Sequence, residues 1–170
     1  MTDQYTNLLK LLRELTKNCN SYYIKHPTTL SKETLNGNTV YSKYQKYNGK
    51  VTDTLLKQHI NNEIDLAISI KDLKNVLVYN YKGKELYAFK NILIELAKSE
   101  NIKNIIVLDY GVNSLSIYID TPNESNIKIL RNKINSIIEN KLPKEWITLP
   151  NTNKPHLSNL IYLPRELFIE

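Results

Sequence analysis

Apolar residues recur at helical spacing in four stretches of the chain, with side chains of the same kind three or four positions apart. Thr2 and Thr52 stand where an N-cap would accept the first free backbone N–H groups. The string Thr121-Pro122-Asn123-Glu124 has the pattern of a capping box with proline at the first helical position. The predicted helices cover residues 2–20, 52–61, 84–99 and 122–138.

Shorter apolar runs alternate with these helices and predict strands. In residues 64–70, Ile and Leu alternate with Asp65, Ala67 and Ser69, which is the two-residue period of a strand. The remaining runs are continuous, and the last one ends at Pro164. The predicted strands cover residues 64–70, 76–79, 105–108, 115–119 and 160–163. A chain of 170 residues with this mixture predicts one α/β (α+β) domain over residues 1–170, with a mixed sheet flanked by helices.

Residues 21–50 do not fit this alternation, because tyrosines are interleaved with lysines and separated by Pro27, Gly37 and Gly49. Tyrosine rings can stack on bases while lysines contact phosphates, so this stretch is a candidate surface for single-stranded nucleic acid. An alternative is a twisted hairpin in which the tyrosines are half-buried. The candidate contacts are Tyr41, Lys43, Tyr44, Lys46 and Tyr47.

The charge distribution favours a polyanionic partner or a solubilising surface. The formal charge is +6, and residues 1–50 carry eight Lys or Arg against three Asp or Glu. Only three residues are Arg, which argues against sequence-specific binding to a duplex. No apolar stretch reaches the roughly 20 residues of a membrane span, so we expect a cytoplasmic protein. The single cysteine, Cys19, is expected to be buried, and no Cys/His spacing predicts a metal site.

Carboxylates are missing where two-metal nucleotidyl transfer would need them. That chemistry uses two or three carboxylates at strand ends, often as D-x-D, to hold Mg²⁺. Two predicted strands end instead in Ser69-Ile70-Lys71 and Asn80-Tyr81-Lys82, where a lysine would repel the metal. We therefore expect a noncatalytic protein with no catalytic residue, metal or cofactor. A nuclease or transferase built from Asp65, Asp72 and Asp109 is the weakest alternative.

The order of these elements resembles the archaeo-eukaryotic primase family. Its catalytic domain runs from a strand bearing D-x-D through a helix and a strand to the turn S-G-x-x-G-x-H, and later to a run close to L-I-x-L-P. Residues 63–72, or in a competing register 76–82, resemble the first strand. Residues 110–116 resemble the turn, with Gly111 kept, and residues 160–164 resemble the later run.

This resemblance implies a primase catalytic-subunit-like fold of RRM-like topology and a role in DNA replication. With the aspartates absent, it implies a noncatalytic subunit that joins the primase catalytic and large subunits and contacts nucleotide or single-stranded DNA template. An ordinary turn and a solvated loop are the alternatives for the sites themselves. The candidate nucleotide or phosphate contacts are Gly111, Asn113, Ser114, Ser116, Lys71, Lys82, Lys154, His156 and Asn159.

A second function fits the same residues. The chain could be a single-stranded nucleic-acid-binding module of RRM-like topology that acts alone through its Tyr/Lys stretch.

Overall fold

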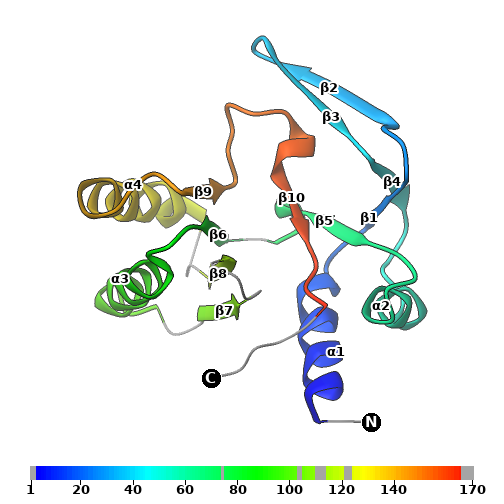
Figure 1. Cartoon of the computed structure of the whole chain (residues 1–170), viewed down its shortest axis with the longest axis horizontal. Coiled ribbons are helices and arrows are strands. Elements are labelled where there is room, and N and C mark those ends of the chain that lie inside the picture. Colours follow the sequence, from blue (N-terminus) through cyan, green and yellow to red (C-terminus); the bar gives the residue numbers. More distant parts are fainter. Residues whose placement is uncertain (1–2, 74, 103–104, 110–113, 121–123, 166–170) are drawn as a thin grey trace. The chain divides into compact units, whose positions relative to one another are not determined.

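The computed structural model describes residues 3–73, 75–102, 105–109, 114–120 and 124–165 (Figure 1). The chain divides into two compact units, Met1–Leu73 with Pro150–Leu167 (unit 1) and Lys74–Leu149 with Phe168–Glu170 (unit 2). Each unit is described by itself below. That the chain behaves as one domain stays a prediction. In the part of the chain that the structure describes, none of the helices combines the length and apolar character needed to cross a membrane.

Unit 1 contains an antiparallel four-stranded sheet of order β10-β5-β1-β4 and a separate β2-β3 hairpin. Two predicted helices are confirmed here, and the side chain of Thr52 accepts the backbone N–H of Leu55, as the predicted N-cap requires. The elements are α1 (Asp3–Thr16), β1 (Ser21–Lys25), β2 (Ser31–Leu35), β3 (Asn38–Ser42), β4 (Tyr44–Asn48), α2 (Asp53–Ile60), β5 (Leu66–Ser69), the 3-10 helices η1 (Ile70–Asp72) and η2 (His156–Asn159), and β10 (Leu160–Tyr162).

Strand β5 lies at the centre of the unit 1 sheet and is buried on both faces. The predicted strand at residues 64–70 is confirmed but is shorter, because η1 begins at Ile70. β10 pairs with one edge of β5 and β1 with the other. All four residues of β5 are buried, including the polar Ser69. The small side chain of Ala67 leaves room above the middle of one face for larger side chains from neighbouring strands.

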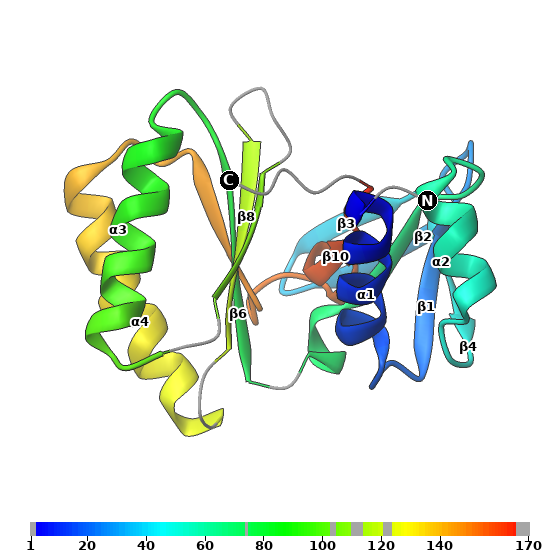
Figure 2. The ribbon, with the colours of Figure 1, turned by 90° about the horizontal axis from the view of Figure 1, so that it is seen from below.

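Unit 2 has the element order β-α-β-β-α-β and an antiparallel sheet of order β7-β8-β6-β9. This is the split βαβ arrangement of ferredoxin-like domains. Figure 2 shows α3 and α4 on the same side of the sheet. The elements are β6 (Val76–Lys82), α3 (Leu86–Ser99), β7 (Ile105–Asp109), β8 (Ser114–Asp120), α4 (Glu124–Lys141) and β9 (Trp146–Leu149).

The mixed α and β character is thus confirmed, but the prediction of a mixed sheet is wrong for the described strands, whose pairings are all antiparallel. The reason in unit 2 is that β8 lies between β6 and β7, so the two strands joined by α3 are not neighbours. The strand β9 was not predicted. The capping box at residues 121–124 falls largely outside the described residues.

The core of unit 2 lies between its sheet and its two helices. Tyr79 and Tyr81 of β6 are buried with Phe89 and Leu93 of α3 and Ile134 of α4 in one apolar cluster. Because side chains alternate across a strand, Asn80 and the other even-numbered positions of β6 point to the opposite face. Trp146 also belongs to this cluster.

Cys19 is fully buried in unit 1, as predicted. Burial, reinforced by the charge of Asp72, raises the pKa of the thiol to about 12. Because the thiolate is the reactive form, we expect an aromatic disulfide reagent to modify the native protein far more slowly than the urea-unfolded protein. A Cys19→Ser variant, which should not react in either state, is the control. Modification of the native protein at the rate of an exposed thiol would contradict this prediction.

Candidate nucleic-acid and nucleotide interface

One face of the unit 1 sheet carries two of the predicted nucleic-acid contacts, Tyr44 and Lys46. In the strand register, Tyr23 is opposite Lys46 and Ala67, Ala67 is opposite Tyr162, and Lys25 is opposite Tyr44. Directly opposite residues of an antiparallel pair project to the same side of the sheet. We call this surface the Tyr23 face. Its side chains are Tyr23, Lys25, Tyr44, Lys46, Ala67 and Tyr162.

His156 stands at one end of the Tyr23 face, where η2 begins. Its Nε2 atom lies 2.7 Å from the Tyr23 hydroxyl. Burial lowers the pKa of His156, and so do the charges of Lys71 and Lys46, whereas Glu33 and Asp72 oppose this shift. The charges of two predicted contacts, Lys46 and Lys71, therefore reach a third, His156, although the three come from distant parts of the chain.

Strand β2 helps to position His156. The Glu33 carboxylate accepts the backbone N–H of Leu157 at 2.7 Å, which ties η2 to the β2-β3 hairpin. Within the loop, the Asn159 side chain accepts the N–H of Asn151 and donates to the carbonyls of Asn151 and Pro155. Asn159, a predicted ligand contact, thus has its hydrogen bonds occupied in shaping the loop that presents His156.

Two polar atoms next to this cluster are buried and lack a hydrogen-bond partner among the described residues: Oδ2 of Asp72 and Nδ1 of His156. Burial raises the pKa of Asp72, against the opposing charges of His156 and Lys46. Sequence reasoning included Tyr23 only as part of the Tyr/Lys stretch, did not select Glu33, and considered Asp72 only for a catalytic role. The only signal available was the position of Asp72 directly after Lys71.

The predicted tyrosines do not form a single platform. Tyr44 stacks on Tyr162, with ring centroids 5.2 Å apart. Tyr47 stacks instead on Tyr22, and since Tyr22 neighbours Tyr23 along β1, this pair lies on the opposite face of the sheet. Tyr41 is on the β2-β3 hairpin, where the Lys32 ammonium lies 5.6 Å from its ring centroid.

The predicted lysines are also dispersed. Lys46 lies on the Tyr23 face, whereas Lys43 lies between β3 and β4. The ammonium of Lys154 is 3.5 Å from the Asn38 amide oxygen near the tip of the hairpin.

The remaining candidates lie in unit 2, on β6 and β8. Asn80 is opposite Ser116 and Lys82 is opposite Ser114, and the Ser116 hydroxyl donates to the Asn80 amide oxygen. Gly111 and Asn113 lie outside the described residues. The two registers considered for the primase strand therefore fall in different units. The register ending at Lys82 is the one on a strand adjacent to Ser116.

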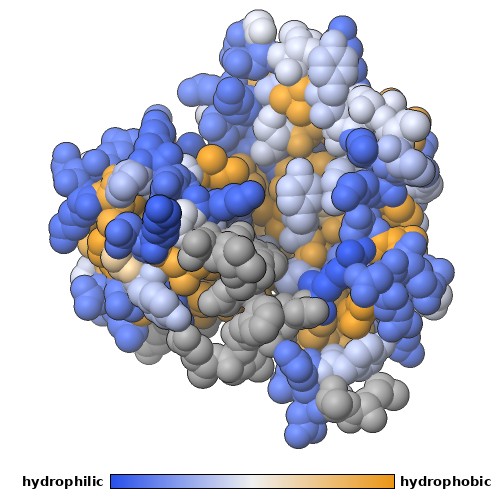
Figure 3. All heavy atoms as spheres, viewed as in Figure 1, coloured by the Kyte–Doolittle hydropathy of each residue, from blue (hydrophilic) through white to orange (hydrophobic). Residues whose placement is uncertain are grey.

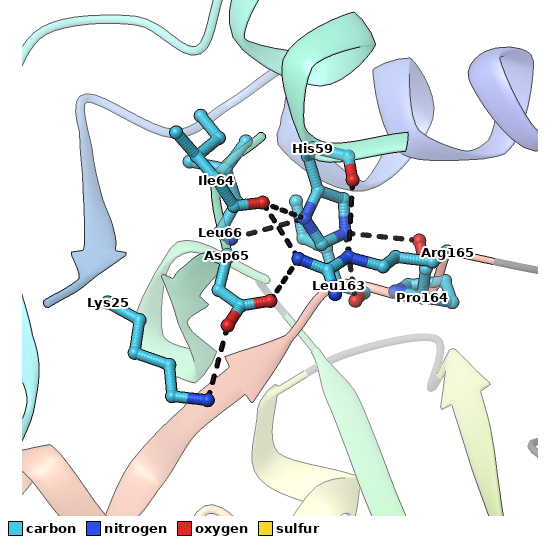
Figure 4. Close-up of polar contacts among 8 residues, drawn as sticks. All are labelled: Lys25, His59, Ile64, Asp65, Leu66, Leu163, Pro164 and Arg165. Carbon is cyan, nitrogen blue, oxygen red and sulfur yellow. Dashed lines mark hydrogen bonds and ion pairs between the residues drawn. The ribbon is translucent and has the colours of Figure 1, made fainter. Parts of the chain in front are cut away.

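A second buried histidine, His59, has a structural role (Figure 4). With the ring proton on Nε2, Nδ1 accepts the Leu66 N–H at 3.2 Å, and Nε2 lies 3.1 Å from the Leu163 carbonyl oxygen and 3.2 Å from that of Pro164. The Ile64 carbonyl oxygen, also 3.2 Å from Nδ1, would be the partner of the other tautomer. Burial lowers the pKa of His59, and the neutral ring fits this arrangement. His59 thereby joins the end of α2 to β5 and to the segment after β10.

Asp65 is held in the same region by two cations (Figure 4). The Arg165 guanidinium donates to the Asp65 carboxylate and to the backbone carbonyls of His59 and Ile64. The Lys25 ammonium lies 3.2 Å from the other carboxylate oxygen. Asp65 and Asp72 belong to unit 1, whereas Asp109 ends β7 of unit 2.

Comparison with known proteins gives a family match over part of the chain but no activity. Residues 2–80 match the model of a domain of unknown function, DUF1882. No curated protein matches the chain. Among the described residues, no three His, Cys, Asp or Glu side chains gather into a group that could hold a metal ion.

Proposed function

We propose that the protein is a noncatalytic accessory subunit of a DNA primase complex and that it contacts nucleotide or single-stranded template through the Tyr23 face. The observation that supports this best is that the His156 Nε2 lies 2.7 Å from the Tyr23 hydroxyl, with Lys46 opposite Tyr23 in the strand register. The charge of Lys71 also reaches His156 and lowers its pKa. Lysines and a histidine beside aromatic rings provide phosphate contacts and a stacking surface together. Because Lys25 and Arg165 neutralise the Asp65 carboxylate, this carboxylate does not offset the electrostatic attraction of nearby lysines for a polyanion.

The primase part of the proposal rests on element order. The succession β6-α3-β7-β8 follows the strand, helix, strand and strand of the family, and Asn80 and Lys82 stand at the end of β6, where the family carries its aspartates. Their side chains are an amide, bonded to Ser116, and an ammonium, and neither would bind Mg²⁺ well. A subunit of this kind resembles PriX, the noncatalytic subunit of archaeal primase, and would assemble with the catalytic and large subunits.

Binding should depend on Lys46 of the Tyr23 face and on Lys71 of η1. We expect a Lys46→Ala, Lys71→Ala double variant to bind a fluorescein-labelled oligo(dT) more weakly than the unmodified protein. The slope of log K against log salt should fall by about 0.7 for each phosphate that the variant no longer neutralises. Lys10→Ala on the exposed part of α1 is the matched control. Equal slopes for the double variant and the unmodified protein would remove this face from the proposal.

The choice of complex needs a separate test. When the tagged protein is purified from its source cells, primase subunits should be recovered with it. The isolated protein, supplied with template, nucleotides and Mg²⁺, should make no primers. The β-α-β-β-α-β order of unit 2 favours a second candidate, a stand-alone single-strand-binding module of RRM-like topology. Strand binding without recovery of any primase subunit would select that second function.

A further inference from the structure

Tyr162 is the most exposed aromatic ring of the Tyr23 face. Tyr44 stacks on it with an interplanar angle of 29°, yet 57% of the residue's surface remains accessible. Tyr44 itself packs against the buried cluster of Tyr23, Ala67 and Leu160. Tyr44 is therefore fixed by the buried cluster, and Tyr162 is held in place by stacking on Tyr44. The accessible surface of the Tyr162 ring belongs to a side chain that is already ordered. Such a ring loses little conformational entropy when a ligand stacks on it.

The surroundings of the pair favour a polyanion. The Tyr44 hydroxyl is close enough to Asp65, Tyr162 and Arg165 for their charges to influence its pKa, which burial raises. Asp65 is neutralised by Lys25 and Arg165, so its carboxylate does not oppose a negative partner. Figure 3 shows pale and hydrophobic residues over the β10, β5 and β1 strands, with hydrophilic residues around them. An apolar aromatic surface with cations at its margin fits an unstacked base and its phosphates.

We propose that Tyr162, supported by Tyr44, stacks on a base of single-stranded nucleic acid, and that the neighbouring phosphates pass Lys25 and Lys46. Sequence reasoning did not select Tyr162 for this role, whereas Lys25 belongs to the Tyr/Lys stretch that it proposed as a surface for single-stranded nucleic acid. A duplex is excluded as the occupant because its bases already stack on one another and leave no face for the ring. The inference rests on the proposed function, and it specifies how the Tyr23 face would hold a strand.

The test compares two exposed tyrosines, one on the Tyr23 face and one on unit 2. A Tyr162→Ala variant should bind fluorescein-labelled oligo(dT) and oligo(U) about 5- to 150-fold more weakly, the loss expected for one stacked base. Tyr162→Phe keeps the ring and should bind within about twofold of the unmodified protein. The matched control is Tyr87→Ala on α3 of unit 2, since Tyr87 is 66% exposed, and it should leave binding unchanged. Thermal unfolding followed by circular dichroism checks that each variant is folded.

Several outcomes would contradict the proposed stacking of a base on Tyr162, which we call the platform. One is equal binding by Tyr162→Ala and the unmodified protein, and another is equal loss in Tyr162→Ala and Tyr87→Ala. Tyr162→Phe binding as weakly as Tyr162→Ala would also do so, because the hydroxyl would then matter rather than the ring. If Tyr162→Ala does not fold, a 5-iodouracil strand cross-linked to the unmodified protein should attach to the peptide with Tyr162 or Tyr44, and attachment elsewhere refutes the platform.

These failures are distinguishable from failure of the proposed function. Strand binding that ignores Tyr162 but still follows Lys46 and Lys71 would overturn the platform and leave the Tyr23 face in place. If the unmodified protein binds neither oligo(dT) nor oligo(U), the platform is refuted. Recovery of primase subunits would then still support an accessory role through docking alone.

Discussion

Replacing His59 with alanine is expected to lower the free energy of unfolding by about 3–5 kcal/mol. The ring is only 2% exposed, so its removal leaves a cavity. It also removes the acceptor for the Leu66 N–H and the donor to the Leu163 and Pro164 carbonyls, and each buried backbone group left unpaired costs about 1–3 kcal/mol. Urea denaturation at pH 7.5, followed by circular dichroism, measures the change.

The same histidine should make the unmodified protein sensitive to acid. Because the folded state holds His59 with a pKa below its ordinary value of 6.5, the unfolded chain binds a proton first as the pH falls. Stability is therefore highest above about pH 6.5 and decreases below it, until the folded-state pKa is reached. His156 has a lowered pKa for the same main reason, burial, and contributes in the same direction.

The His59→Ala variant should retain only the part of this acid sensitivity that is due to His156. His26→Ala is the matched control, since His26 is half-buried and has the Tyr47 hydroxyl 3.2 Å from its Nε2. We expect the control to lose at most about 1.5 kcal/mol, the usual size of one hydrogen bond. If His59→Ala were no less stable than His26→Ala, or if its stability fell with acid as steeply as that of the unmodified protein, the structural role of His59 would be wrong.

Replacing Phe89 with alanine should have an effect of similar size in unit 2. Phe89 is completely buried and stacks on Tyr81, with ring centroids 4.5 Å apart, so truncation removes this packing, leaves a cavity and costs about 3–5 kcal/mol. Tyr87→Ala, two positions earlier on the same helix, is the control for helix propensity and should change stability by less than about 0.5 kcal/mol. Chemical denaturation of both variants measures the difference.

Phe89→Ala also tests whether the two units unfold together. Each unit has its own sheet and its own apolar cluster, so we expect unit 2 to melt first in this variant while Cys19 of unit 1 stays protected. Thiol modification and circular dichroism, followed at increasing urea concentrations, should then give two midpoints. Coincident midpoints would instead support the single domain that the sequence predicts.

The elements that could be predicted from the sequence are those with a local signal. All four helices show apolar residues at a period of 3.6, and the longer strands show continuous apolar runs. β9 was missed because it has only four residues between Pro143 and Pro150, and its burial depends on pairing with β6. The polar strands β1 to β4 were ambiguous, since half-buried tyrosines are equally compatible with a hairpin and with a binding surface.

The sequence predicts several residues of the candidate site but not how the fold brings them together. Lys46, Lys71 and His156 could be selected by residue type and by the resemblance to primases, but their meeting depends on the pairing of β5 with β1 and β10. The dispersal of Tyr41, Tyr44 and Tyr47 follows from the alternation and turns of strands whose bounds the sequence does not define. Tyr162 was placed on a predicted strand, yet nothing local indicates that its ring would lie on Tyr44.

The return of β10 to the side of β5 sets an order of events during synthesis. The ribosome releases Lys74–Leu149 of unit 2 before it releases β10, the strand that closes the sheet of unit 1. Until then β5 has one free edge, and neither Tyr162 nor His156 is available to Tyr44 and Tyr23. The segment matched by the family model ends within β6, so a protein truncated there would lack Tyr162 and His156 and would contain an unpaired strand prone to aggregation. A nascent chain should therefore gain the affinity that Tyr162 contributes only after β10 has emerged.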